Sequence, residues 1–573
     1  MNGLSFNIIA GLILLAVGLV LPSSALVQGL RGSGAVGEPA LVQGAWLFKA
    51  GLVTFGAYLL ALRLLPVRQP PVHIRPEISE ASPVQTAIFI ALLVCATALR
   101  LHDLDVGIWY DEMLTSVYYM PMTVGQIVST YHDANNHVLF SVLARLSLSV
   151  FGDSVWAFRL PAVLFGIGGV AALYYLARRV SGTNESLFAA ALLTFSYHHI
   201  WFSQNARGYT ALLFFSILSS AWLLDAIRHG SPRKWGLYCL AVVLGAFTHP
   251  TMGLMALAQF MIWGATLFGR TAQRAPCPWN GLFCGFIPVG LLTFQAYALV
   301  LPSMVGGALL NSGLQGRDNE WTNPLWAFAE LVSSLRIGFA SGGVVLVAGA
   351  VFAIGLLDFI RKRPAVASLF LIPVVVGFTV MTSIGYTLFP RFFFFAFGFA
   401  IIIVIRGATV TGRFLERFLP LPASAAGWLP ALLCAGIVSA SVLSLRHVYL
   451  PKQNYAAAIE LIERETQPGD TVLTVGIAGF PFNAYYGKEW PTIETVEELE
   501  RLGSETGRTW LIYTMPVHAK TTYPEILARI DKDFTVVDRF HGSLGGGDVV
   551  VCRENIDRGA RAGTGRLVSK GSE

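Results

Sequence analysis

The sequence predicts a polytopic α-helical membrane protein with about thirteen transmembrane helices. It also predicts interfacial helices in the first outer loop and a small α/β domain at the C-terminal end. Of the 573 residues, 54% are hydrophobic and only 13% are charged, whereas about a quarter of a soluble chain is charged. The apolar residues form long runs separated by short basic loops, and this pattern ends near Pro451. The formal charge of +6 therefore reflects membrane topology rather than a nucleic-acid-binding surface.

Each expected span is an apolar run of about 17–25 residues, and only the run 235–249 is clearly shorter. The run 6–22 has no Lys or Arg before it, which favours a retained anchor over a cleaved signal peptide. The expected spans are 6–22, 44–66, 83–101, 157–177, 185–203, 208–227, 235–249, 251–268, 281–301, 338–358, 366–388, 391–406 and 426–445.

Basic residues orient these spans, because cytoplasmic loops are enriched in Lys and Arg. They fall in alternate loops: Arg68 with Arg75, Arg178 with Arg179, Arg228 with Arg233 and Lys234, Arg270 with Arg274, Arg361 to Arg363, and Arg413 with Arg417. The alternation places the N-terminus inside, and it places 102–155, 302–337 and everything beyond 446 outside. We therefore expect a multi-pass protein of the cytoplasmic (inner) membrane whose C-terminal domain is extracytoplasmic.

Shifts in composition divide the chain into four regions. Residues 1–82 hold two N-terminal spans and a basic, proline-rich linker. Residues 83–450 form the transmembrane core, and residues 555–573 form a tail whose Gly, Arg and Ser content predicts disorder. Residues 451–554 form the expected α/β domain.

Local patterns predict the secondary structure of the two polar regions. Within 102–155, we expect interface-lying helices over 122–131 and 138–151. In the C-terminal domain, the patterns predict helices over 455–466 and 525–530, and strands over 472–475, 510–513, 534–537 and 548–552.

The stretch from Ile108 to Glu112 follows directly on a span that closes at Arg100. Carboxylates placed where a membrane helix emerges are costly, and this marks Asp111 and Glu112 as candidate catalytic residues. Trp109 and Tyr110 suit the same interfacial depth and are expected to line the site. A simpler alternative is that the two carboxylates only begin the next, interface-lying helix.

Other polar residues are expected on the same outer face, which argues for one shared cavity. Asp133, Asn136 and His137 belong to the first outer segment, and we assign them to acceptor binding or to the lining of the site. Cations at hydrocarbon depth suit the phosphate of a lipid whose tail stays in the bilayer. The residues assigned to the donor phosphate are Arg207, Tyr209, Arg391, His249 and His198.

The sequence leaves the cofactor open. Carboxylates suit either proton abstraction from a hydroxyl or a divalent cation, so a metal, if one binds, is expected at Asp111 and Glu112. No Walker loop or dinucleotide fingerprint is present, and the glycine cluster at 545–547 precedes an expected strand rather than a helix. Lipid-linked phosphate chemistry fits these observations best.

These residues resemble a known family, the C-type glycosyltransferases that use polyprenyl-phosphate sugars. The chain looks similar to protein O-mannosyltransferases and lipid A aminoarabinose transferases over about residues 83–450. The resemblance is carried by Trp109-Tyr110-Asp111-Glu112, by Phe151-Gly152-Asp153-Ser154 with Arg159-Leu160-Pro161, by Leu173 to Arg179 and by Ser203 to Tyr209. Relatives usually carry a His/Lys-Pro-Pro stretch where this chain has Asn135-Asn136-His137-Val138, which leaves acceptor specificity open.

The resemblance implies that Asp111 is the base of a sugar transferase whose partners are a polyprenyl-phosphate sugar, the bilayer and a lipid, glycan or protein acceptor. We therefore expect inverting transfer to a hydroxyl at the outer membrane face, with no nucleic acid involved. Two alternatives stay open: a transporter or flippase of lipid-linked oligosaccharides, and a polysaccharide polymerase or ligase. The sequence does not identify the sugar, the acceptor, the oligomeric state or the role of the C-terminal domain.

Overall fold

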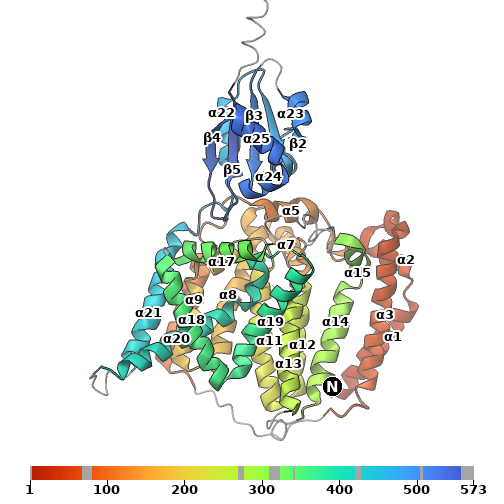
Figure 1. Ribbon diagram of the computed structural model, residues 1–573. Helices are drawn as coiled ribbons and strands as arrows, with labels where there is room; N and C mark the ends of the chain where they lie inside the picture. The colour runs from red at the N-terminus through yellow and green to blue at the C-terminus, as the bar shows by residue number, and fades with distance from the viewer. Residues whose placement is uncertain are drawn as a thin grey trace, which may run out of the picture. The chain divides into compact units, whose positions relative to one another are not determined.

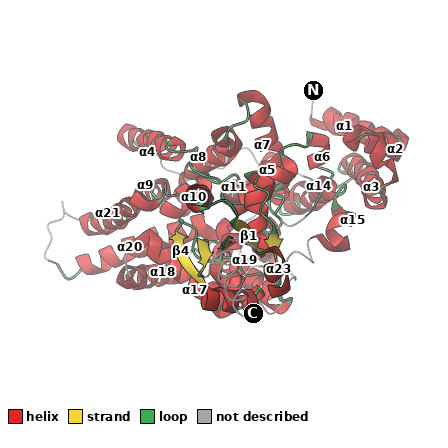
Figure 2. Ribbon diagram, turned by 90° about the horizontal axis from the view of Figure 1, so that it is seen from above, coloured by secondary structure: helices red, strands yellow, loops and turns green. Residues whose placement is uncertain are grey.

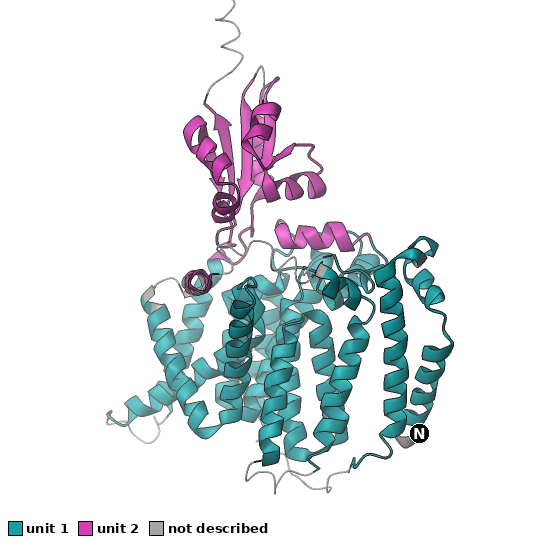
Figure 3. Ribbon diagram, turned by 45° about the vertical axis from the view of Figure 1, so that its right-hand side comes forward, with its two compact units in different colours: residues 1–104, 122–315, 335–446 teal, residues 105–121, 316–334, 447–573 magenta. Residues whose placement is uncertain are grey.

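The computed structural model describes residues 3–67, 80–132, 135–268, 277–308, 323–339, 342–419, 427–503 and 507–555. The chain divides into two compact units, shown in Figure 3. Unit 1 holds residues 1–104, 122–315 and 335–446, and unit 2 holds residues 105–121, 316–334 and 447–573. The expected linker around Arg68 and Arg75 and the expected tail beyond residue 555 lie outside the described residues.

Unit 1 is a bundle of helices (Figure 1). Its helices are α1 (Gly3–Val20), α2 (Ser23–Arg31), α3 (Pro39–Ala61), α4 (Pro83–Leu101), α6 (Val124–Ile127), α7 (Val138–Phe151), α8 (Val155–Val180), α9 (Thr183–Thr194), α10 (Tyr197–Ser203), α11 (Tyr209–His229), α12 (Pro232–Thr248), α13 (Met252–Phe268), α14 (Ile287–Tyr297), α15 (Leu301–Ser303), α18 (Gly342–Lys362), α19 (Pro364–Ser383), α20 (Phe397–Glu416) and α21 (Trp428–Leu443). Shorter helical turns are η1 (Ser33–Gly37), η2 (Leu282–Phe286), η3 (Met304–Ala308) and η5 (Pro390–Ala396). The helix α17 (Pro324–Phe339) crosses the division between the units, and η7 (Ser444–His447) ends at it.

In unit 1, capping groups mark the start of α4 and the end of α11. The α4 helix starts with a capping box, in which Ser82 Oγ accepts from the Gln85 N–H at 3.2 Å and Gln85 Oε1 accepts from the Ser82 N–H at 2.9 Å. The α11 helix ends at Gly230, whose φ of 66° is a left-handed conformation that glycine adopts without strain. Seen from above in Figure 2, α1 to α3 lie at one edge beside α14 and α15, with α20 and α21 at another.

Close helix contacts in unit 1 depend on small residues. A Cβ added to Gly355 on α18 would lie 2.0 Å from the carbonyl oxygen of Ile403 on α20, and one added to Gly407 would lie 1.8 Å from that of Val351. The two backbones therefore touch, as is common where membrane helices pack through glycines.

The length and composition of the helices support a multi-pass membrane protein. Among the described residues, seven helices are long and apolar enough to cross a membrane, or eight if the bent pair α1 and α2 counts as one span. In the part of the chain that the structure describes, each expected apolar run contains helix, but the count of about thirteen spans stays a prediction.

Two expected elements are wrong in detail. The run 185–203 is not one helix, because α9 ends at Thr194 and Ser196 caps the separate helix α10 through the His199 N–H at 3.4 Å. The expected helix over 122–131 is only Val124–Ile127, a single capped turn. The expected helix over 138–151 is confirmed as α7.

Unit 2 contains a five-stranded sheet in the order β2-β1-β3-β5-β4. The strands are β1 (Thr471–Val475), β2 (Thr492–Ile493), β3 (Thr509–Thr514), β4 (Phe534–Phe540) and β5 (Val549–Glu554). Strand β1 runs parallel to β2 and β3, and β5 runs antiparallel to β3 and β4. The expected strands over 472–475, 510–513, 534–537 and 548–552 are confirmed to within a few residues.

Helices complete unit 2. They are α5 (Tyr110–Tyr119), α22 (Tyr455–Glu465), α23 (Val496–Leu502), α24 (Pro516–Thr522) and α25 (Pro524–Asp533), with the turns η8 (Gly476–Ala478) and η9 (Phe480–Tyr485). Strand residues such as Leu473 and Leu511 are fully buried in one core with Ile526 of α25. The helix α5 belongs to this unit although it precedes the sheet by more than three hundred residues of sequence.

Candidate functional site

The Asp-Glu pair begins helix α5 of unit 2. Trp109 is the N-cap, and Asp111 and Glu112 occupy the first turn, where carboxylates interact favourably with the helix dipole. Glu112 Oε2 accepts a hydrogen bond from the Trp109 N–H at 3.4 Å. The simpler alternative, in which a carboxylate only begins the next helix, therefore applies to Glu112. Asp111, whose side chain is also buried, stays a predicted base.

The residues that frame this pair are also placed by unit 2. Trp109 is only 1% exposed. The Tyr110 ring packs against Phe480 of η9 with a centroid distance of 5.9 Å, and Tyr118 stacks on the same ring at 5.5 Å. Among the described residues, no three His, Cys, Asp or Glu side chains form a group that could hold a metal ion.

A second cluster of predicted site residues lies in unit 1, where the chain enters α7 and α11. The His137 ring lies edge-on to Tyr209 at 4.9 Å and to His249 at 4.8 Å. Arg207 Nη2 lies 3.1 Å from His137 Nε2, and Arg207 Nη1 donates to the carbonyl oxygen of Asn135. These four side chains, His137, Arg207, Tyr209 and His249, are each at most 6% exposed. We call them the cation cluster, after the Arg207 guanidinium among them.

A backbone N–H faces Nδ1 in each of the two histidines. The Gly208 N–H donates to His137 Nδ1 at 2.8 Å, and the Thr251 N–H donates to His249 Nδ1 at 3.2 Å. A neutral imidazole whose Nδ1 accepts must carry its hydrogen on Nε2. His249 therefore presents an N–H donor at Nε2, whereas both ring nitrogens of His137 face donors, because Arg207 Nη2 lies 3.1 Å from its Nε2.

The His137 pKa agrees with a neutral ring. Burial, followed by the positive charge of Arg207, lowers it well below its ordinary value, and His249 and Arg391 act in the same direction. Arg207 Nη2 lies within hydrogen-bond distance of His137 Nε2, at 3.1 Å, and a guanidinium can only donate. A phosphate oxygen beside Arg207 would receive charge-assisted hydrogen bonds.

Gly208 permits this arrangement. A Cβ added there would lie 2.6 Å from Thr248 Cγ2 and 2.9 Å from His137 Nδ1, so any side chain would separate the backbone N–H from the ring. The sequence marked Gly208 only as the residue between Arg207 and Tyr209, and its role could not be found without the contact.

The remaining predicted residues have varied surroundings. Arg391 lies at the start of η5, with its guanidinium 4.1 Å from the Phe389 ring centre. His198 on α10 packs edge-on to Tyr197 at 5.3 Å and Phe397 at 6.4 Å. Asn136 accepts from Ser141 Oγ at 2.9 Å and donates to the Thr130 carbonyl at 3.2 Å, which folds the loop before α7. Asp133 lies outside the described residues.

The opposite end of the unit 1 bundle carries the basic loops. Arg179 at the end of α8 pairs with Asp225 at the end of α11 at 2.8 Å, and Lys234 joins them at 3.4 Å. Arg406 bridges Glu185 at 2.9 Å and Asp358 at 2.8 Å. The cation cluster lies where α11 begins, so the two sets of charges occupy opposite ends of the helices.

Arg100 makes buried polar contacts at the end of α9 that the sequence did not indicate. Arg100, which is fully buried, donates to the carbonyl oxygens of Leu193 and Thr194 at 3.1 and 3.3 Å and lies 2.7 Å from His199 Nδ1. A cation at the C-terminus of α9 is favourable because the last carbonyls of a helix lack partners. Arg100 thus fixes the break between α9 and α10.

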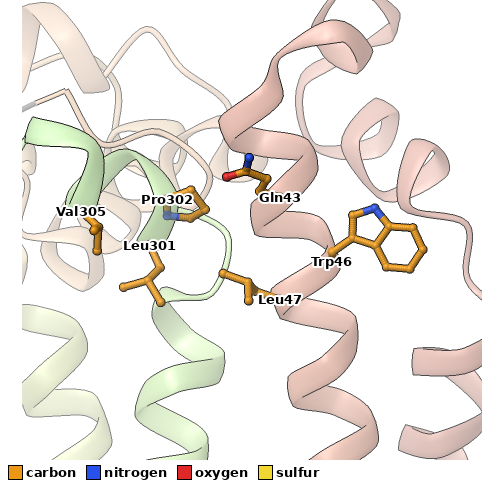
Figure 4. A pocket seen from close by; sticks show the side chains of 6 residues that line it. All are labelled: Gln43, Trp46, Leu47, Leu301, Pro302 and Val305. Atoms are coloured by element: carbon orange, nitrogen blue, oxygen red, sulfur yellow. The ribbon is translucent and has the colours of Figure 1, made fainter.

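The structure also has an apolar groove between α3 and α15 (Figure 4). Its volume is about 490 Å³, and it is lined by Gln43, Trp46, Leu47, Leu301, Pro302 and Val305. None of these six side chains ionises, so the groove does not suit proton transfer or phosphate binding. We take the cation cluster of unit 1 and the first turn of α5 in unit 2 as two candidate sites, each described within its own unit.

A protein-family model matches part of the chain. Residues 137–293 match the family described as dolichyl-phosphate-mannose-protein mannosyltransferase. The matched range contains His137, Arg207 and His249, whereas Asp111 and Arg391 fall outside it. The match confirms the predicted resemblance to glycosyltransferases that use polyprenyl-phosphate sugars. None of the curated proteins matches this sequence closely enough to count as a relative.

Solved structures of similar architecture include three glycosyltransferases. ArnT from Cupriavidus metallidurans, bound to undecaprenyl phosphate, is 14% identical, with 82% of this chain and 98% of that chain covered and a TM-score of 0.48. The oligosaccharyltransferase AglB from Archaeoglobus fulgidus, in complex with an inhibitory peptide and a dolichol-phosphate, is 11% identical, with coverages of 80% and 74% and a TM-score of 0.45. The arabinosyltransferase EmbB from Mycobacterium smegmatis is 14% identical, with coverages of 78% and 47% and a TM-score of 0.41. Likeness at this level carries no argument about function.

Proposed function

We propose that this protein transfers a sugar, with inversion, from a polyprenyl-phosphate-linked donor to a hydroxyl of a lipid, glycan or protein acceptor at the outer face of the cytoplasmic membrane. The observation that carries the proposal is the buried Arg207 guanidinium beside His137, with Arg207 Nη2 3.1 Å from His137 Nε2. They lie in the part of the chain that matches a mannosyltransferase family.

The cation cluster binds the donor phosphate in this proposal. The phosphate oxygens accept hydrogen bonds from Arg207, which lies against His137, and His249 supplies a further N–H from Nε2. Arg391 adds positive charge within electrostatic reach of His137. Because the departing phosphate becomes more negative as its bond to the sugar breaks, these groups stabilise the transition state more than the ground state.

Asp111 acts on the acceptor. The acceptor hydroxyl oxygen attacks the anomeric carbon, the bond from that carbon to the phosphate oxygen breaks, and the hydroxyl proton passes to the Asp111 carboxylate. A single displacement inverts the anomeric centre and needs one base, whereas retention would need a covalent intermediate. Glu112 orients the start of α5 through the Trp109 N–H.

The position of the cluster favours transfer over transport. Transporters of lipid-linked substrates are expected to bind near the bilayer midplane between repeats. Here Arg207 and Tyr209 lie at the beginning of α11, and the ion pairs of Asp225 lie at its other end. A polymerase or ligase would use the same donor chemistry and differ in the size of its acceptor.

The test combines lipid analysis with binding. Mass spectra of the lipid and glycan pools should show one glycosylated product that is lost when the gene is deleted and restored by the wild-type chain. Purified protein should bind undecaprenyl phosphate, and Arg207→Gln should weaken this binding. Unchanged pools together with no binding of the polyprenyl phosphate would reject the proposal.

A further inference from the structure

The start of helix α5 is held by a side chain that lies far away in the sequence. Gln453, which is 1% exposed, accepts the Tyr110 N–H through Oε1 at 3.0 Å. The N–H groups in the first turn of a helix have no partner inside that helix. Gln453 thus accepts the Tyr110 N–H, just as Glu112 accepts the Trp109 N–H. Asp111 lies between Tyr110 and Glu112 in the chain.

The other end of the Gln453 amide is fixed in the sheet domain. Its Nε2 donates to Thr514 Oγ1 at 3.1 Å and to the Gly547 carbonyl oxygen at 3.2 Å. Thr514 is the last residue of β3, and Gly547 precedes β5. Both amide hydrogens and the amide oxygen are therefore in use, which fixes the orientation of the side chain.

Aromatic packing holds α5 at a second point. The Phe480 ring on η9 contacts Tyr110 and Tyr118, which lie at the two ends of the helix. Tyr455 on α22 is fully buried, and burial raises its pKa; a hydrogen bond to Thr514 lowers it, and Tyr110, Tyr486 and then Asp111 raise it by smaller amounts. Direct packing from η9, and Gln453 bonded to the end of β3, thus hold the start of α5.

We propose that Gln453 is a positioning residue, and that the function of the C-terminal sheet domain is to hold Asp111 in its working geometry through the first turn of α5. This inference rests on the proposed function for its catalytic consequence. In open sheets with parallel strands, ligands usually bind outside the carboxyl ends of the strands. Here Gln453, bonded to Thr514 at the carboxyl end of β3, links the start of α5 to that edge. The domain therefore acts as a support for the site.

A misplaced base is costly because proton transfer requires hydrogen-bond distance, and a displacement of about 1 Å can reduce the rate by about 10²-fold. Gln453→Leu keeps the approximate volume but removes every hydrogen bond of the amide. We expect kcat to fall by about 10–100-fold, with unchanged binding of undecaprenyl phosphate. Gln453→Glu keeps an acceptor for the Tyr110 N–H but loses the donors to Thr514 and Gly547, so it should restore part of the rate.

Asp470 provides a control. Its Oδ1 accepts the Arg508 N–H at 2.8 Å and its Oδ2 accepts from Trp510 Nε1 at 3.0 Å, so it is also a bridging side chain in unit 2, at the end of the sheet opposite Thr514. Asp470→Leu should lower the stability of the domain but leave kcat of the folded protein unchanged. Equal losses of kcat in Asp470→Leu and Gln453→Leu would show a general effect of domain stability and would overturn the positioning role.

Hydrogen–deuterium exchange tests the inference without any assay of transfer. In full-length protein in nanodiscs, Gln453→Leu should speed exchange of the amides at 109–113, and Asp470→Leu should not. Unchanged exchange at 109–113 in Gln453→Leu would overturn the inference even if the protein is a transferase. Faster exchange in a protein that transfers no sugar would instead reject the proposed function and leave the support of α5 intact.

Discussion

At the scale of single residues, proton acceptance and phosphate binding are proposed for different groups. Asp111 and Glu112 are adjacent, yet Glu112 is engaged by the Trp109 N–H at the start of its own helix. In unit 1, backbone N–H groups donate to Nδ1 of His137 and of His249. Residue types alone indicated charge and hydrogen bonding, but the donor or acceptor state of each ring followed from its neighbours.

Asp111→Asn should abolish the base while keeping the shape of the side chain. A positioned carboxylate contributes about 10²–10⁴-fold to proton transfer, so turnover should fall by about that factor. Binding of undecaprenyl phosphate should survive, because the phosphate contacts are elsewhere. Asp103→Asn is the control, since Asp103 is an exposed carboxylate on the same segment. Normal turnover of Asp111→Asn in a purified assay would contradict the mechanism.

Arg207→Lys should keep the charge and lose the planar fork that bonds two oxygens at once. We expect weaker binding of the polyprenyl phosphate, measured by titration in nanodiscs. Arg413→Lys, at an exposed site beside Glu185 near the opposite end of the helices, should bind normally. Full affinity in Arg207→Lys would contradict a phosphate-binding role for Arg207. Arg391→Lys is tested in the same way.

At the scale of elements, helix breaks and close backbone contacts determine where the polar groups lie. The predicted span 185–203 breaks into α9 and α10 because Ser196 caps a new helix and Arg100 binds the last carbonyls of α9. Hydropathy could not show this break, because the residues on both sides are apolar. The loop that follows α10 carries Arg207 and Gly208 to the start of α11.

Gly208→Ala tests how closely this loop packs on His137. The added Cβ would overlap Thr248 Cγ2 and His137 Nδ1, and overpacking of this kind costs about 1–3 kcal/mol. We expect a lower melting temperature and weaker binding of undecaprenyl phosphate, because the N–H that fixes the His137 ring is displaced. Gly236→Ala is the matched control, since a Cβ there meets nothing within 4 Å. Wild-type binding by Gly208→Ala would argue against a role for the Gly208–His137 contact.

At the scale of the whole molecule, the chain combines a helical membrane bundle with a sheet domain that includes a distant helix. Positive charges gather at one end of the bundle, and the cation cluster lies at the other. This pattern agrees with the alternation of basic loops in the sequence. The direction in which each end faces is a prediction from the positive-inside rule.

Cysteine labelling tests that orientation. In a background without the six native cysteines, single cysteines at His132 and Lys488 should react with an impermeant reagent added from outside. Cysteines at Arg178 and Lys362 should react only after the membrane is opened, because Lys and Arg are retained on the cytoplasmic side. Labelling of position 178 from outside would show that the topology is inverted and that the proposed site lies on the cytoplasmic face.

The sequence by itself determined the features that depend on composition and short-range pattern. These are the helical membrane class, the apolar runs, the strands of the C-terminal domain and the choice of Arg207, His137 and His249 as site residues. Such features can be predicted locally, because the length of an apolar run and the alternation along a strand are properties of consecutive residues. The tertiary structure decided the rest: the N–H of Gly208 on His137, the break fixed by Arg100, and the attachment of Tyr110 to Gln453. Each joins groups separated by seventy to several hundred residues, and no local pattern specifies which distant donor meets which acceptor.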